Sequence, residues 1–115
     1  MKLINITNHP SNNWNENQKS GYEEVIDFRF PLIDPRASEE EIDKLSDQFL
    51  NEVKKQYTPS DTQVMVMGEF TFSFSLIKKL KNNGFSVVAA TTERKAIEED
   101  GVKKSVFEFV RWREY

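Results

Sequence analysis

The sequence TQVMVMGEFT (residues 62–71), continued by FSFSLIKKL (residues 72–80), decides the fold of this chain. Its apolar first part is bounded by turn-forming residues and is too short to span a membrane, which is typical of a central strand. Gly68 allows a sharp turn, and Thr71 is a candidate N-cap for a helix that ends at Gly84. Such a turn leaves backbone N–H groups free at a helix N-terminus, where an anion can bind. We therefore expect a strand, a turn and a helix, with a candidate anion site between them.

The apolar residues of this stretch fit two periodicities. Between residues 70 and 76 every second residue is apolar, which is the period of a strand. On a helix, the apolar residues at positions 72, 76, 77 and 80 would share one buried face, and Phe74 would lie at its edge. We favour the helix because Gly68 and Gly84 lie where a turn and a helix C-cap are needed. If residues 70–76 form a strand, the anion site loses its helix N-terminus.

Turn-forming residues and changes of periodicity divide the rest of the chain. Residues 94–101 form either one helical turn or a loop. We expect strands at residues 2–7, 24–30, 85–90 and 102–112, a short helix at 14–20 with Trp14 facing the core, and a long helix from Ser38 to about Gln56.

The long helix has the strongest local signal. Ser38 and Glu41 match a capping box, and the acidic residues of the first turn complement the helix dipole. Apolar residues then recur at spacings of three and four along one face: Ile42, Leu45, Phe49 and Val53.

Composition limits the class of protein. A chain of 115 residues with 37% hydrophobic residues fits one packed domain, residues 1–115. The net charge of −3 argues against binding to long nucleic acid. Without cysteine and with one histidine, the chain has no disulfide and no transition-metal constellation, and we expect no metal and no cofactor. The polar N-terminus predicts a cytoplasmic protein without a membrane segment.

The alternation of strands and helices predicts an α/β fold, a Rossmann-like three-layer sandwich with a mainly parallel five-stranded sheet. The connection before the last strand is too short for a crossover helix, so this strand should lie antiparallel at an edge. In such sheets ligands bind beyond the carboxyl ends of the strands.

Polar side chains follow three of the expected strands, and their convergence at one edge is the main functional signal. The residues at these exits are Asn8, His9 and Ser11 after the first strand, Gly68, Glu69 and Thr71 after the third, and Thr91, Thr92, Glu93 and Arg94 after the fourth.

Each candidate has a structural alternative. His9 is the only histidine, the residue type that ordinarily titrates near neutral pH, yet an Asn-His-Pro turn is also a common structural element. Trp14 can stack on a base or pack in the core. Arg94 and its neighbouring hydroxyls suit phosphate contacts or a plain strand-ending turn. Glu69 is either a general base or a solvated turn residue.

The clusters at Thr7–Pro10, Met67–Thr71 and Thr91–Arg94 make the chain resemble small CRISPR-associated proteins related to CARF (CRISPR-associated Rossmann-fold) domains. Some of these proteins stand alone as ring nucleases of type III systems. The resemblance covers most of the chain in its pattern of strands and turns. It implies a single CARF-like domain and a homodimer that binds a cyclic oligoadenylate across its two-fold axis.

The resemblance also implies metal-independent cleavage, in which a ribose 2′-hydroxyl attacks the adjacent phosphate and leaves a 2′,3′-cyclic phosphate. On this chain, Gly68 and Thr71 would hold phosphate, Arg94 would stabilise charge, and His9 or Glu69 would move the proton. The remaining expected ligand contacts are Asn8, Ser11, Trp14, Thr91 and Thr92.

The sequence therefore predicts a protein that binds a small cyclic nucleotide, with cleavage left open. Two alternatives remain: a non-catalytic regulatory or protein-interaction module that uses its sheet edge and Phe-rich surface, and an enzyme acting on another small phosphorylated ligand.

Overall fold

Five strands form one sheet in the computed structural model, which describes residues 1–115. The sheet has the order β2-β1-β3-β4-β5, with parallel neighbours except for the antiparallel pair β4 and β5. This confirms an α/β fold with a mainly parallel sheet and an antiparallel C-terminal edge strand. The strands are β1 (Lys2–Thr7), β2 (Glu24–Arg29), β3 (Thr62–Val66), β4 (Ser86–Glu99) and β5 (Val102–Glu114).

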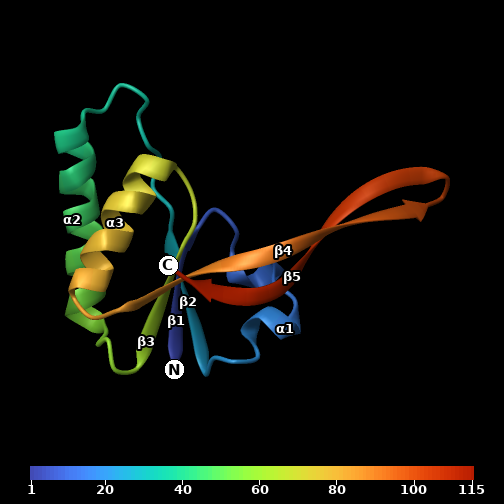
Figure 1. Ribbon diagram of the computed structural model, residues 1–115, viewed down its shortest axis with the longest axis horizontal. Coiled ribbons are helices and arrows are strands. Elements are labelled where there is room, and N and C mark those ends of the chain that lie inside the picture. The colour runs from blue at the N-terminus through green and yellow to red at the C-terminus, as the bar shows by residue number, and fades with distance from the viewer.

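Two long helices, α2 (Glu39–Gln56) and α3 (Phe70–Asn82), lie side by side over one face of the sheet (Figure 1). The segment between β1 and β2 carries only a short 3-10 helix, η1 (Ser11–Asn13), and the four-residue α1 (Glu16–Lys19). None of these helices combines the length and the apolar character needed to cross a membrane.

The ends of both long helices follow local sequence signals. Ser38 and Glu41 form the predicted capping box at the start of α2. The helical alternative for residues 70–76 is confirmed, and the chain leaves α3 through Gly84 with a positive φ of 88°. The side chain of Phe74 is exposed at the edge of α3, as its helical position predicts.

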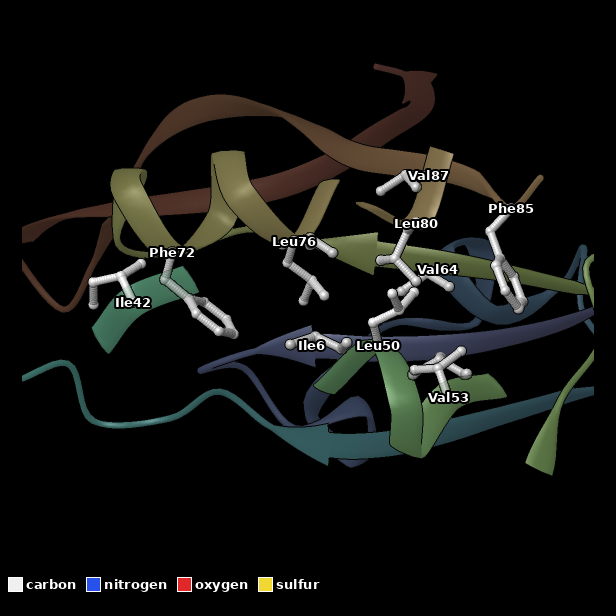
Figure 2. Close-up of a cluster of buried hydrophobic side chains, with 12 residues drawn as sticks. Ile6, Ile42, Leu50, Val53, Val64, Phe72, Leu76, Leu80, Phe85 and Val87 are labelled. Carbon is white, nitrogen blue, oxygen red and sulfur yellow. The ribbon is translucent and has the colours of Figure 1, made fainter. Parts of the chain in front are cut away.

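Figure 2 shows the main core, in which side chains of α2 and α3 point at the sheet. Packing aromatic and branched side chains into this layer supplies the main favourable term of folding. Its fully buried members include Ile4 and Ile6 from β1, Val64 and Val66 from β3, Val53 from α2, and Phe72, Leu76 and Leu80 from α3.

The opposite face of the sheet carries a smaller cluster of Leu3, Met65 and Val88. Trp14 packs against this cluster, with its ring centroid 5.9 Å from that of Trp112. The expectation that Trp14 faces the core is therefore confirmed, and its indole is engaged with another aromatic ring rather than free to stack on a base.

Strands β4 and β5 run far beyond the rest of the sheet. The predicted strand end near Ala90 and the predicted helical turn or loop at residues 94–101 are both wrong. β4 continues to Glu99, and Asp100 and Gly101, with φ of 52° and 77°, close a two-residue turn into β5. The ladder continues because β5 supplies a partner along this whole length. Figure 1 shows the resulting hairpin projecting away from the helices and the other strands.

Candidate functional site

The chain leaves the neighbouring parallel strands β1 and β3 toward opposite faces of the sheet. After β1 it forms η1 and α1 on the side of the smaller cluster, and after β3 it forms α3 on the side of the main core. The strand order reverses at this point, where open α/β sheets characteristically hold their ligands. Two of the three expected exits, at Asn8–His9 and Gly68–Glu69, therefore lie at one edge, and we name it the β1/β3 edge.

Two buried polar side chains of β1 hold the backbone of His9. Asn5 is 1% exposed and Thr7 is 6% exposed. The Asn5 side-chain amide donates to the His9 carbonyl at 2.9 Å, and the His9 amide donates to the Thr7 hydroxyl at 3.1 Å. The Thr7 hydroxyl in turn donates to the side-chain oxygen Oδ1 of Asn5 at 2.8 Å. Hydrogen bonds on both sides of His9 thus fix the point from which its exposed imidazole projects.

Asp27 on β2 completes this network. Asp27 lies opposite Asn5 in the β1–β2 ladder, and its carboxylate accepts a hydrogen bond of 3.0 Å from the Asn5 side-chain amide. The same carboxylate accepts bonds from the backbone amide and the hydroxyl of Ser11, each at 3.2 Å to Oδ2. The expected contact residue Ser11 is therefore at the edge, but its polar groups already bind Asp27.

Asn5, Thr7 and Asp27 were not among the predicted site residues. A local signal existed, because two polar residues two positions apart inside a buried strand share one face and require partners. Their partner could not be identified from sequence, since Asp27 is 22 residues from Asn5.

A cavity of about 720 Å³ opens beside this network, at the carboxyl ends of β1 and β2. Arg29, the last residue of β2, lines it and makes none of the ion pairs of this chain. The exit of β2 was not considered as a source of site residues, although it lies at the same edge. The other lining residues are Thr7, Asn8, Pro10, Asp27, Phe28, Phe30, Pro31 and Leu32.

Glu69 caps α3, so the prediction of Thr71 as the N-cap is wrong. The Glu69 carboxylate accepts the Phe72 amide at 2.8 Å and the Thr71 hydroxyl at 2.8 Å. These hydrogen bonds hold the pKa of Glu69 below its ordinary value. A carboxylate of the chain itself therefore occupies the helix N-terminus where a bound anion was expected, and a lowered pKa makes Glu69 a weaker base.

The chain bends at Gly68 as expected, and Gly68 is also required by a close contact with another segment. Its φ is not positive, unlike that of Gly84 and Gly101. A Cβ at this position would lie 2.3 Å from the ring of Phe30, a distance that real Cβ atoms do not show. The absence of a side chain lets the loop after β2 close over the end of β3.

The third expected exit is not a strand end, because β4 continues through it to Glu99. Thr91, Thr92 and Arg94 lie within β4, and the Thr91 hydroxyl donates to the Arg111 carbonyl at 3.0 Å. The Arg94 guanidinium donates to the Ser105 hydroxyl at 3.0 and 2.8 Å, on the projecting hairpin of Figure 1. Only two of the three expected exits are therefore strand ends, and the end of β2 lies beside that of β1.

The groups that remain available at the edge are the His9 imidazole, the Asn8 side chain and the Arg29 guanidinium. Together they can donate hydrogen bonds to an anion, and the imidazole can also carry a proton. No group of three or more histidine, aspartate or glutamate side chains is arranged to hold a metal ion.

Comparison with curated proteins gives no match, and comparison with solved structures gives none either. Residues 1–113 match the family described as "Uncharacterized protein MJ1673 family". Since this match covers both long helices and all five strands except the last residue of β5, the chain belongs to the MJ1673 family.

Proposed function

We propose that this chain is a Rossmann-like nucleotide-binding domain that holds a cyclic oligoadenylate at the carboxyl ends of β1 and β2, beside the β1/β3 edge. The observation that carries the proposal is the fixed presentation of His9 by the buried side chains of Asn5 and Thr7. Burying a polar side chain is costly unless it is hydrogen-bonded, and here the hydrogen bonds of Asn5 and Thr7 go to a surface loop. A loop that is already fixed loses less conformational entropy when a ligand binds to it.

The cavity beside the loop has the chemistry that a nucleotide needs. Its volume of about 720 Å³ lies within the usual range for small-ligand sites. The Arg29 guanidinium suits a phosphate, because it can donate two parallel hydrogen bonds to its oxygens. Phe28, Phe30 and Leu32 line the same cavity and offer apolar surface to a base. The choice of a cyclic oligoadenylate within this class rests on the resemblance to CARF-related proteins.

We expect this chain to bind the nucleotide and to cleave it slowly or not at all. Of the three residues expected to act in catalysis, Glu69 caps α3 and Arg94 lies on the hairpin. His9 alone would have to remove the proton of the attacking 2′-hydroxyl and also deliver a proton to the leaving oxygen. Proton transfer in both directions by a single residue predicts slow turnover at best.

The test is calorimetric titration of the chain with cyclic tetra-adenylate and cyclic hexa-adenylate in EDTA, followed by chromatography of the nucleotide. We expect binding with little or no linear product. Absence of binding to both rings, with the chain folded by circular dichroism, would overturn the proposal. Rapid formation of linear product would overturn the priority of binding over cleavage.

Two variants locate the site. His9→Ala and Arg29→Ala should each weaken binding on the order of tenfold. This is the effect expected when one charge-assisted or well-placed hydrogen bond to the ligand is lost. Arg36→Ala is the matched control, because Arg36 is an exposed arginine paired only with Asp34 and does not line the cavity. Equal affinities for Arg29→Ala and Arg36→Ala would exclude the cavity as the binding site.

A second candidate, a protein-interaction module, is favoured by two exposed aromatic side chains on α3. Phe70 is 89% exposed and Phe74 is 55% exposed, and both line open cavities on the two sides of the helix. Exposed aromatic pairs of this kind often mark a binding surface. A Phe70→Ser/Phe74→Ser variant that keeps nucleotide binding but loses a partner recovered with the wild-type chain would support this function.

A further inference from the structure

The part of the hairpin that projects beyond the other strands is an unusual feature of the molecule. We name residues 92–109 the arm; it consists of two antiparallel strands joined at Asp100–Gly101. Strand β3 pairs only with Ser86–Val88 of β4, so both outer edges of the arm are free of neighbouring strands. An isolated two-stranded ribbon is marginally stable in water, and a free strand edge is a template for pairing with another chain.

The β5 side of the hairpin carries most of its exposed apolar surface. On β4 the only large exposed apolar side chain is Ile97. On β5 there are four: Val102, Val106, Phe107 and Val110. Apolar side chains on a free edge favour β5 as the strand that pairs.

The charges of the arm are incompletely compensated along the same strand. Glu93 and Glu108 lie directly opposite each other in the ladder, which places two like charges on one face. Lys95 binds Glu108 at 3.0 Å, but no second cation of the chain pairs with these carboxylates. Lys104 makes only a long contact of 3.8 Å with Glu99.

We propose that two copies of this chain pair through their β5 edges, antiparallel, around a two-fold axis at Val106. In this register Val106 faces the partner's Val106. Lys104 faces the partner's Glu108, and the reverse contact forms on the other side of the axis. In each chain, the partner's Lys104 then lies beside the like-charged pair Glu93 and Glu108. The charges along β5 are therefore complementary to those of β5 in a second, antiparallel copy.

The backbone allows this register. Residues that flank a two-residue hairpin turn form a hydrogen-bonded pair, so Glu99 and Val102 point their backbone groups at each other. Along β5 the even-numbered residues of the arm then bond to β4, and Ser105 and Phe107 direct their N–H and C=O groups outward. A two-fold axis at Val106 pairs Ser105 with the partner's Phe107, which joins outward-directed groups on both strands. The Val106 pair is then a non-hydrogen-bonded pair, with Cα atoms about 4.5 Å apart.

The competing arrangement uses the β4 edge. There, an axis at Ile97 would place Lys95 opposite the partner's Glu99. This arrangement offers the same number of lysine–glutamate contacts, but the larger exposed apolar surface of β5 would stay uncovered. The β5 arrangement is therefore favoured, and the two make different predictions for cross-linking.

Cysteine substitutions distinguish the two edges, because the chain has no cysteine of its own. Val106→Cys should form a disulfide-linked dimer on mild oxidation, since the expected Cα separation suits a disulfide. Ile97→Cys is the matched control, because Ile97 and Val106 are similarly exposed, at 41% and 37%. Cross-linking of the Ile97→Cys chain in preference to the Val106→Cys chain, or equal slow cross-linking of both, would overturn the proposal.

Charge reversal tests the register independently. Lys104→Glu and Glu108→Lys each create a like-charge contact on both sides of the axis and should weaken the dimer on the order of tenfold or more. An equimolar mixture of the two variants should form a heterodimer, because the introduced glutamate of one chain faces the introduced lysine of the other. On the other side of the axis, the unchanged Glu108 of the first chain faces the unchanged Lys104 of the second.

Sedimentation velocity measures the wild-type chain, each variant and the mixture. A monomeric wild-type chain, or a mixture no more dimeric than its components, would contradict the proposal whether or not the chain binds a nucleotide.

Discussion

The ring of Phe30 fills the space in which a side chain at Gly68 would have to lie. A Cβ on Gly68 would be 2.3 Å from two atoms of that ring. The ring also stands edge-on to Phe72, with centroids 5.3 Å apart, so it cannot move toward α3 without clashing with that buried side chain. This relationship joins the segments after β2 and β3 at the edge where the candidate site lies.

Gly68→Ala should destabilise the fold by about 1–3 kcal/mol, the usual cost of forcing an extra carbon into packed surroundings. Gly21→Ala is the control, since no atom lies within 4 Å of a Cβ at that position and its φ is not positive. Its free energy of unfolding should stay the same or rise slightly. Urea unfolding of both variants gives the comparison. Equal stability of the two variants would show that the Phe30 ring gives way at little cost.

Glu69→Ala should lower the free energy of unfolding at neutral pH by about 0.5–2 kcal/mol, because α3 loses its N-cap. The pKa of Glu69 is lowered by its bonds to Phe72 and Thr71, so its contribution exists above the ordinary glutamate pKa of about 4.3. It is lost as the pH falls from that value through the lower pKa of the folded state. The stability difference between wild type and variant should therefore shrink on acidification. A difference independent of pH would mean that charge plays no part in the cap.

Asn5→Ala should cost about 1–3 kcal/mol, because it leaves the buried Thr7 hydroxyl and the Asp27 carboxylate without their shared partner. It should also weaken nucleotide binding in the fraction that remains folded, since the His9 carbonyl keeps only the longer, 3.3 Å bond from the Thr7 hydroxyl. Ser11→Ala is a milder change at an exposed position and should alter stability by less than about 0.5 kcal/mol. Hydrogen exchange at the Ser11 amide reports the loop directly. Unchanged exchange in Asn5→Ala would show that the network does not hold the loop.

Tyr22 should make the fold sensitive to alkaline pH. Burial raises the pKa of Tyr22 to about 12, whereas an unfolded tyrosine ionises near pH 10. The unfolded state thus releases its proton first, and stability present below pH 10 should be lost as the pH rises from about 10 toward 12. Tyr22→Phe should flatten this decline, as measured by unfolding at a series of alkaline pH values. An equally steep decline in the variant would assign the effect to other groups, Tyr115 among them, whose pKa burial also raises.

Much of the architecture follows from local sequence. The capping box at Ser38 and the spacing of apolar residues predicted α2, because both act within a few residues of chain. Residues 70–76 fit both a strand and a helix period, and the favoured helix is the one observed. Phe72, Leu76 and Leu80 form its buried face. The order of strands and helices was also predicted, since turns and changes of period are local features.

The candidate site was predicted only in part. Asn8 and His9 were placed at the carboxyl edge because that follows from the position of a strand end. The roles of Asn5 and Arg29 were missed, because each depends on a neighbour from another strand. Glu69 was considered as a base, whereas its capping contact depends on where α3 begins, and sequence locates helix ends less firmly than helices.

The sequence by itself determined which segments are helix and strand, except for residues 91–99, and which faces of them are apolar. The tertiary structure decided where β4 ends, which strands lie side by side, and which polar groups meet. The physical reason is that a strand extends as far as a partner continues to bond to it, and a buried polar side chain is placed by acceptors far away in the chain. Thr91, Thr92 and Arg94 illustrate the difference: their chemistry suited a strand exit, but the presence of β5 alongside kept them inside β4.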